Sequence, residues 1–176
     1  MLSFPDKRSK IYSQSEDLDA HQIIPNLWLG NKVAAADASF LKGNKIAVVF
    51  NCTRDVPNFF EGKISGIKYY KLEVDDSLQK KDINIMTEFL VSYVPILDFF
   101  IKKKIPVLVH CWAGMQRSAC MVAALLIYNR IKLDNAIVHI KKIRNIAFTP
   151  QINFIDSLLI FTNIYQNIRN YSIDRQ

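Results

Sequence analysis

Residues able to bind and attack a phosphate-like anion gather in one short stretch of this sequence, Val107–Ser118. In that stretch Cys111 is followed by Gly114 and then by Arg117. A cysteine thiolate is a strong nucleophile, and a guanidinium offers a planar fork of donors that can hold two phosphate oxygens at once. Glycine lets the backbone approach a ligand closely. The stretch therefore predicts a phosphate-binding loop in which Cys111 attacks and Arg117 holds the oxygens.

The segments on either side of this loop are typical of elements that would position it. The apolar run Pro106–Val109 predicts a buried strand that ends at His110, and Ser118–Arg130 predicts a helix covered on nearly all sides. A ligand at the carboxyl end of that strand would meet the unpaired amides and partial positive charge of the helix start. These surroundings favour the thiolate form of Cys111, and Ser118 is placed to donate a hydrogen bond to its sulfur.

The rest of the chain alternates between strand-like and helix-like segments, which predicts an α/β fold. We expect a central, mostly parallel sheet of about five strands, covered by helices on both faces. Residues 1–20 are polar and predict a loose arm. The expected strands and helices outside the loop region are Leu27–Leu29, Ile46–Asn51 and Ile67–Val74, and Val33–Leu41 and Leu133–Asn145.

Two further helices carry specific predictions about where they begin and break. One begins near Asp82, a suitable N-cap, and Pro95 should kink or split it. The last helix should use Thr149 as its N-cap and Pro150 as its first residue, and run to about Arg169. In the helix Leu133–Asn145, His139 falls on the polar side and is expected at the surface.

Composition limits the kind of protein this is. The chain has 176 residues with 23 basic and 16 acidic side chains, a net charge of +7 that favours anionic partners. Its three cysteines form no CxxC pair, which favours a reduced, intracellular protein in the cytoplasm or nucleus. The longest apolar run, Phe89–Ile101, is interrupted by Pro95 and Asp98, so we expect no membrane span. The histidines and cysteines lack metal-ligand spacing, so we expect no metal.

The loop resembles that of a known enzyme family. His110-Cys111-x-x-Gly114-x-x-Arg117-Ser118 is similar to the HCxxGxxRS phosphate-binding loop of the cysteine-dependent protein phosphatases. The resemblance implies hydrolysis of phosphorylated proteins through a cysteinyl-phosphate intermediate, without a cofactor. Oligomeric state is not indicated.

The small dual-specificity branch of that family, which accepts phosphotyrosine and phosphoserine or phosphothreonine, resembles this chain over roughly residues 22–162. Ile24–Gly30 is similar to its opening strand, Val48–Cys52 to its second core strand, and Leu72–Ser77 to its general-acid loop. The likeness implies that residues 21–176 form a catalytic domain.

The resemblance also implies roles for individual residues. The family spacing favours Asp76 over Asp75 as the general acid, while His110 would orient nearby backbone. Many members carry asparagine where this chain has Gln151, so the Gln151 amide is expected to brace the loop. The remaining positions expected to contact the phosphate are Trp112, Ala113, Gly114, Met115 and Gln116. Trp112 and Met115 could pack into the core or project to the pocket rim; because amides that point inward leave side chains pointing outward, we expect them on the rim.

Other functions for the same loop stay open. Relatives that act on phosphoinositides or on RNA 5′-triphosphate ends carry basic or histidine residues inside the loop, whereas the variable positions here are uncharged. That argues against both, and against nucleic acid as a partner, although the net charge keeps an RNA substrate in view. A non-catalytic phosphopeptide-binding module is a third alternative, which the presence of both Cys111 and Arg117 disfavours. The remaining alternative is that Cys111 is simply a buried structural thiol.

Cys52 is a candidate redox partner of Cys111. It follows Asn51 at the end of a strand that we expect beside Pro106–His110, so both cysteines would lie at the same sheet edge. A neighbouring thiol can trap an oxidised Cys111 as a reversible disulfide. The alternative is that Cys52 simply fills space under the loop, as we expect of Cys120 within its apolar helix.

Overall fold

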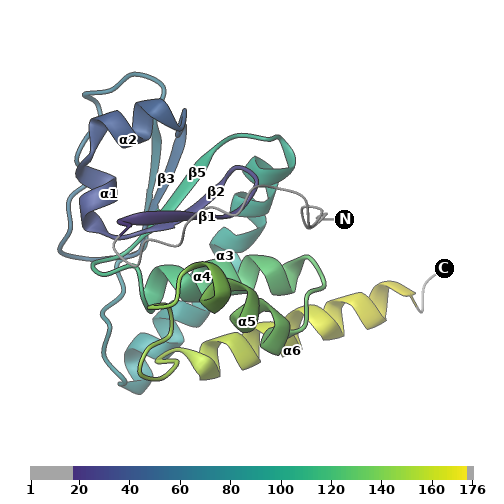
Figure 1. Cartoon of the computed structure of the whole chain (residues 1–176). Helices are drawn as coiled ribbons and strands as arrows, with labels where there is room; N and C mark the ends of the chain where they lie inside the picture. Colours follow the sequence, from purple (N-terminus) through teal and green to yellow (C-terminus); the bar gives the residue numbers. More distant parts are fainter. Residues whose placement is uncertain (1–17, 174–176) are drawn as a thin grey trace.

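A computed structural model describes residues 18–173 and contains one five-stranded sheet (Figure 1). The strand order is β1-β2-β5-β3-β4, and only the edge strand β1 is antiparallel to its neighbour. The prediction of a mostly parallel α/β sheet is therefore confirmed. The strands are β1 (Ala20–Ile24), β2 (Leu27–Gly30), β3 (Val48–Asn51), β4 (Lys68–Lys71) and β5 (Val107–His110).

Helices cover both faces of this sheet (Figure 1). Strand β5 explains why, because Leu108 is buried in a smaller core on one face while Val107 and Val109 are buried in the larger core on the other. A strand covered on both sides needs a continuous apolar run. The smaller core is closed by α1 (Lys32–Ala36) and α2 (Ala38–Gly43), and the larger by α3 (Lys80–Lys102), α4 (Arg117–Tyr128), α5 (Leu133–Ile143) and α6 (Ile155–Ile173).

The segment predicted as one helix from Val33 to Leu41 forms two helices that are separated at Asp37. The Asp37 backbone is extended, with φ −94° and ψ 101°, and its carboxylate accepts hydrogen bonds from Ser39 N and Phe40 N at 2.8 and 3.1 Å. A side chain that caps the first turn of a following helix interrupts the preceding one. The left-handed turn after α2 falls at Lys45, φ 54°, and not at a glycine.

Helix α3 corrects the prediction of its start and excludes one of the two effects predicted for Pro95. It begins at Lys80, and Asp82 is buried in its first turn, where its carboxylate accepts a hydrogen bond from Ser77 Oγ. The helix also continues through Pro95 without being split. Proline cannot donate to the carbonyl four residues earlier, which belongs to Val91. The Tyr165 hydroxyl on α6 donates to that carbonyl at 3.4 Å, so the oxygen keeps a partner.

The last helix begins later than predicted. Thr149 and Pro150 are joined by a cis peptide bond and lie in the loop before α6, which starts at Ile155. They therefore do not serve as its N-cap and first residue. The preceding helices α4 and α5 also end two residues earlier than expected, at Tyr128 and Ile143.

Within residues 18–173, α3 is the one helix whose length and composition would let it cross a membrane. It packs against α4 and α6, and its buried residues include Asp82 and Asp98. Asp98 pairs with Lys102 at 2.6 Å and accepts a hydrogen bond from Asn129. These contacts are those of a helix in a protein core, so the membrane candidate is a weak one. Residues 1–17 of the predicted arm lie outside the described residues.

Candidate active site

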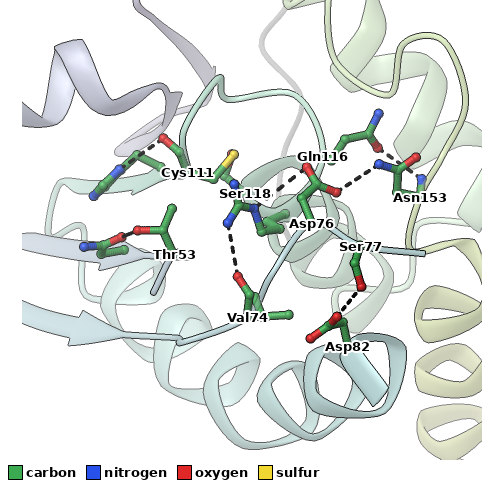
Figure 2. Close-up of polar contacts among 12 residues, drawn as sticks. Thr53, Val74, Asp76, Ser77, Asp82, Cys111, Gln116, Ser118 and Asn153 are labelled. Carbon is green, nitrogen blue, oxygen red and sulfur yellow. Dashed lines mark hydrogen bonds and ion pairs between the residues drawn. The ribbon is translucent and has the colours of Figure 1, made fainter. Parts of the chain in front are cut away.

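The loop between β5 and α4 lies at the carboxyl edge of the sheet (Figure 1). Its first residue is Cys111, the predicted nucleophile. His110 pairs with Gly30 of β2 on one side and with Asn51 of β3 on the other, so β5 is a central strand at this edge. Cys111 is buried, and Ser118 Oγ donates to its Sγ at 3.1 Å. Figure 2 shows the two side chains together at the loop. The structure thus brings together the two residues that the sequence paired.

The carbonyl groups of the loop are held by donors outside it. In a trans peptide unit the carbonyl of one residue and the amide N–H of the next point in opposite directions. Holding the carbonyls of residues 112–115 therefore turns the amides of residues 113–116 to the other side, and within the described chain none of these amides donates to a protein acceptor. The four contacts are Lys32 N to Trp112 O (3.1 Å), Arg144 Nη2 to Ala113 O (3.2 Å), Arg144 Nε to Gly114 O (2.8 Å) and Phe148 N to Met115 O (2.8 Å).

Gly114 is required by packing as well as by backbone conformation. Its φ is +68°, a left-handed value that disfavours other residues. A Cβ at this position would lie 2.6 Å from the Gly30 carbonyl oxygen and 2.7 Å from Arg144 Nη2. Only glycine lets the loop lie this close to β2. Four unpaired amides in a row, at the start of a helix, form an anion-binding concavity.

Arg117 is the first residue of α4, and its side chain is almost fully buried. Its Nη1 donates to Val74 O at 3.1 Å, which ties the guanidinium to the segment that follows β4. Its Nε lies 3.8 Å from Asp76 Oδ2 and makes no hydrogen bond to the described residues. A buried donor without a partner is costly, so the site favours an acceptor beside it. A phosphate oxygen is such an acceptor.

The two neighbouring aspartates have different surroundings. Asp76 lies beside Arg117, and its Oδ1 accepts a hydrogen bond from Asn153 Nδ2 at 2.9 Å (Figure 2). Asp75 instead forms an ion pair with Arg54 at 3.4 Å, with both side chains about half exposed. The contact geometry thus supports the assignment of Asp76 that the spacing favoured.

These features coincide with a family match. The sequence profile described as "Dual specificity phosphatase, catalytic domain" matches residues 27–164. The chain belongs to this family. It is 31% identical over 157 residues to "Dual specificity protein phosphatase 2" of Homo sapiens, covering 89% of this chain and 46% of that protein, and 33% identical over 141 residues to "Dual specificity protein phosphatase 4" of Gallus gallus, covering 80% and 36%. The chain thus spans less than half the length of these relatives.

Solved structures support the fold of this dual-specificity phosphatase domain. A mouse putative dual specificity phosphatase complexed with zinc tungstate matches with a TM-score of 0.76 and 23% identity, over 92% of this chain and 97% of that one. A human tyrosine phosphatase-like serine/threonine/tyrosine-interacting protein matches with a TM-score of 0.67 and 24% identity, over 84% and 97%. At these identities the likeness concerns the fold alone.

The bracing role predicted for Gln151 belongs to other side chains in this phosphatase domain. Gln151 is exposed and contributes its backbone carbonyl, which accepts from Gln116 Nε2 at 2.8 Å. The buried Gln116 side chain also donates to Thr149 O and accepts from Asn153 N, so it ties the phosphate loop to the segment before α6. Asn153 then reaches Asp76. The side-chain amide that braces the phosphate loop is thus that of Gln116, while the Asn153 side chain, two residues after Gln151, holds Asp76.

The histidines fall into two different positions. His110 is buried, with Nδ1 3.4 Å from Cys111 O, and burial lowers the pKa of its imidazole to about 4. At neutral pH its ring is therefore uncharged and, with so low a pKa, a weak proton acceptor, in agreement with an orienting role and not with that of a general base. The prediction that His139 is a surface residue was wrong. It is partly buried, and its Nε2 lies 3.0 Å from Ile23 O, which links α5 to β1.

The three cysteines are all free. Cys52 does follow the strand next to β5, where its N–H donates to His110 O at 2.8 Å. Its thiol is fully buried, with Sγ 3.9 Å from Met121 Sδ, and burial raises its pKa well above the ordinary value. These surroundings suit a space-filling residue under the loop. A disulfide between Cys52 and Cys111 stays a prediction. Cys120 is fully buried in α4, as expected of a packing residue.

Trp112 lies on the surface of the loop, with 48% of the residue exposed. The Lys32 ammonium is 3.2 Å from the centroid of its ring, a cation–π contact that also places a positive charge beside the loop. Met115 is partly buried. The structure thus agrees with a rim position for Trp112.

Arg144 is a residue of the site that no sequence motif singled out. It is 1% exposed and directly follows α5. A signal for its burial was present, because Arg144 lies four residues after Ile140 and eight after Ala136, the two buried residues of that helix. An arginine that continues an apolar stripe is a candidate for a buried brace.

Proposed function

We propose that this domain is a dual-specificity protein phosphatase, which hydrolyses phosphotyrosine and phosphoserine or phosphothreonine in proteins through a cysteinyl-phosphate intermediate. The observation that carries the proposal is the single site formed by Cys111 Sγ, the unpaired loop amides, Arg117 and Asp76. Membership of the dual specificity phosphatase family supports it.

In the first step, the loop amides and Arg117 hold the phosphate oxygens while Cys111 Sγ attacks phosphorus. The sulfur–phosphorus bond forms as the bond from phosphorus to the side-chain oxygen breaks. Asp76, in its carboxylic acid form, gives its proton to the departing oxygen. The fixed donors stabilise the charge on the equatorial oxygens.

In the second step, the Asp76 carboxylate takes a proton from a water molecule that attacks the phosphocysteine. The sulfur–phosphorus bond breaks, inorganic phosphate is released and the thiolate returns. The Ser118 hydroxyl, which already donates to Sγ at 3.1 Å, stabilises the charge on the departing sulfur. Aspartate thus acts as acid and then as base, and the second step restores its protonation state.

The partner implied by this activity is a phosphorylated protein. The four variable loop positions are uncharged, which disfavours phosphoinositide and RNA substrates. The intact pairing of Arg117 with Asp76 disfavours a module that only binds phosphopeptides. The three free cysteines support an intracellular location, cytoplasmic or nuclear.

The proposal is tested by turnover of p-nitrophenyl phosphate and of phosphotyrosine and phosphothreonine peptides. The wild-type protein should hydrolyse all three. Cys111→Ser should abolish turnover, because a serine hydroxyl stays protonated. The variant should still fold and should still bind inorganic phosphate, the product of the reaction. Arg117→Lys should be nearly as inactive, since an ammonium cannot make the bidentate contact.

Substantial turnover by the Cys111→Ser variant would contradict the covalent mechanism. If the protein hydrolyses a phosphoinositide or an RNA 5′-triphosphate faster than every phosphopeptide, its substrate class would be that compound and not phosphorylated proteins. Phosphopeptide binding by a wild-type protein without any turnover would favour the binding module.

A further inference from the structure

The Arg144 guanidinium connects two parts of the molecule that are far apart in the sequence. On one side Nε and Nη2 donate to the carbonyls of Gly114 and Ala113 at 2.8 and 3.2 Å. On the other side Nη1 donates to Leu18 O at 3.0 Å and lies 2.9 Å from His21 Nδ1. The guanidinium thus lies between the phosphate loop and the N-terminal edge of the sheet.

We propose that Arg144 is a positioning residue for the phosphate loop and that the N-terminal edge holds it in place. Because it fixes two successive carbonyls, it turns the amides of Gly114 and Met115 to the face where the phosphate would bind. The contacts with Leu18 and His21 in turn limit where the guanidinium can lie. This inference rests on the proposed function of the loop as a phosphate site.

The charge of Arg144 is as informative as its hydrogen bonds. Within the described chain no carboxylate lies at ion-pair distance from it, although the residue is buried. Burial lowers the pKa of its guanidinium, as expected when a cation is removed from water. Carbonyl oxygens compensate such a charge only partly. An anion bound in the loop would supply further compensation, so Arg144 should favour the occupied loop over the empty one.

Lysine cannot replace this arrangement. The guanidinium is planar and donates in three directions, to two loop carbonyls and to the N-terminal edge. A lysine ammonium is a point charge on a flexible stem and cannot reach all of these acceptors in one geometry. Comparing the two side chains therefore separates the contribution of charge from that of the fork.

The experiment compares Arg144→Met and Arg144→Lys with a control, Lys141→Met, which removes the same charge from an exposed position on α5. The readouts are kcat, KM and the inhibition constant of inorganic phosphate, with the folded fraction checked by circular dichroism. We expect Arg144→Met to lose about 10²-fold in kcat, the size expected when reacting groups are misplaced by about 1 Å. Phosphate inhibition should weaken in parallel. Arg144→Lys should recover part of the phosphate binding but little of kcat, and Lys141→Met should match the wild type.

The contact between Arg144 and His21 is tested by His21→Phe, which keeps a ring but removes the Nδ1 acceptor. Phosphate inhibition should weaken by roughly three- to tenfold, the worth of one hydrogen bond. His21→Asn keeps an acceptor near the position of Nδ1 and should lose less. If Arg144→Met does not fold, Arg144→Lys and the two His21 variants decide the proposal.

A folded Arg144→Met protein with the kcat and phosphate inhibition of the wild type would overturn the inference, and so would equal losses in Lys141→Met. A wild-type protein without turnover would instead count against the proposed function. In that case, the rise in Tm with inorganic phosphate still reports loop binding. An equal rise in the wild type and in Arg144→Met or Arg144→Lys would overturn the positioning role, and a smaller rise in the variants would support it.

Discussion

At the scale of single residues, Asp75 and Asp76 offer a matched pair for testing the general acid. Asp76 lies beside Arg117 and Asn153, whereas Asp75 pairs with the exposed Arg54. We expect Asp76→Ala to lower kcat by about 10²–10⁴-fold on alkyl phosphates, whose leaving group needs a proton. The loss should be much smaller on activated aryl phosphates. The measurement is kcat for a series of phosphate esters of increasing leaving-group pKa.

Asp75→Ala is the control, since it removes a neighbouring carboxylate that lies outside the site. It should leave the dependence on leaving group close to that of the wild type. The reverse ranking of the two variants would assign the acid to Asp75.

Asn153→Ala, which frees the Asp76 carboxylate from one contact, should show a weaker form of the Asp76→Ala profile.

At the scale of the elements, α3 and α6 are joined by a hydrogen bond that Pro95 makes necessary. The Val91 carbonyl has no backbone donor at residue 95, and Tyr165 Oη donates to it at 3.4 Å. Tyr165→Phe should lower the free energy of unfolding by about 1 kcal/mol, since a partly buried carbonyl then loses its donor. Urea denaturation measures the change.

A double-mutant cycle isolates this effect. In Pro95→Ala the new amide can donate to Val91, so Tyr165→Phe should cost less in that background than in the wild type. Equal costs in both backgrounds would show that the hydroxyl contributes through some other contact.

At the scale of the whole molecule, buried His110 makes stability depend on pH. Burial lowers the pKa of the imidazole from 6.5 to about 4 in the folded protein. Between these values the unfolded chain binds a proton that the folded protein does not, so the free energy of unfolding should fall as pH drops from about 6.5 to about 4. At about 1.4 kcal/mol per pH unit the total loss is on the order of 3 kcal/mol. The pKa of His21 is also lowered, by burial and then by Arg144, and adds in the same direction.

Urea denaturation at several pH values between 7.5 and 4.5 measures this loss. Carboxylates also titrate near the acid end, so the informative quantity is the difference between the wild type and His110→Gln. The variant should be less stable at neutral pH but lose less stability on acidification. Parallel curves for the two proteins would mean that the His110 imidazole has the same pKa in the folded and the unfolded chain.

The loop motif and the two elements that flank it could be predicted from the sequence alone. The pattern from Val107 to Ser118 is local, because a buried strand, a turn and a helix start each leave their mark within a few residues. The alternation of strands and helices likewise follows from which faces must be apolar. These features need no knowledge of what the rest of the chain contacts.

How the loop is held, and which distant residue contacts Asp76, depends on the tertiary structure. Arg144 is separated from Gly114 by 30 residues, and Asn153 from Asp76 by 77, so no local pattern pairs them. The continuity of α3 through Pro95 depends in the same way on Tyr165, 74 residues after Val91. Each contact exists because the sheet order and helix packing bring distant segments together, so that a donor on one segment lies within hydrogen-bond distance of an acceptor on another.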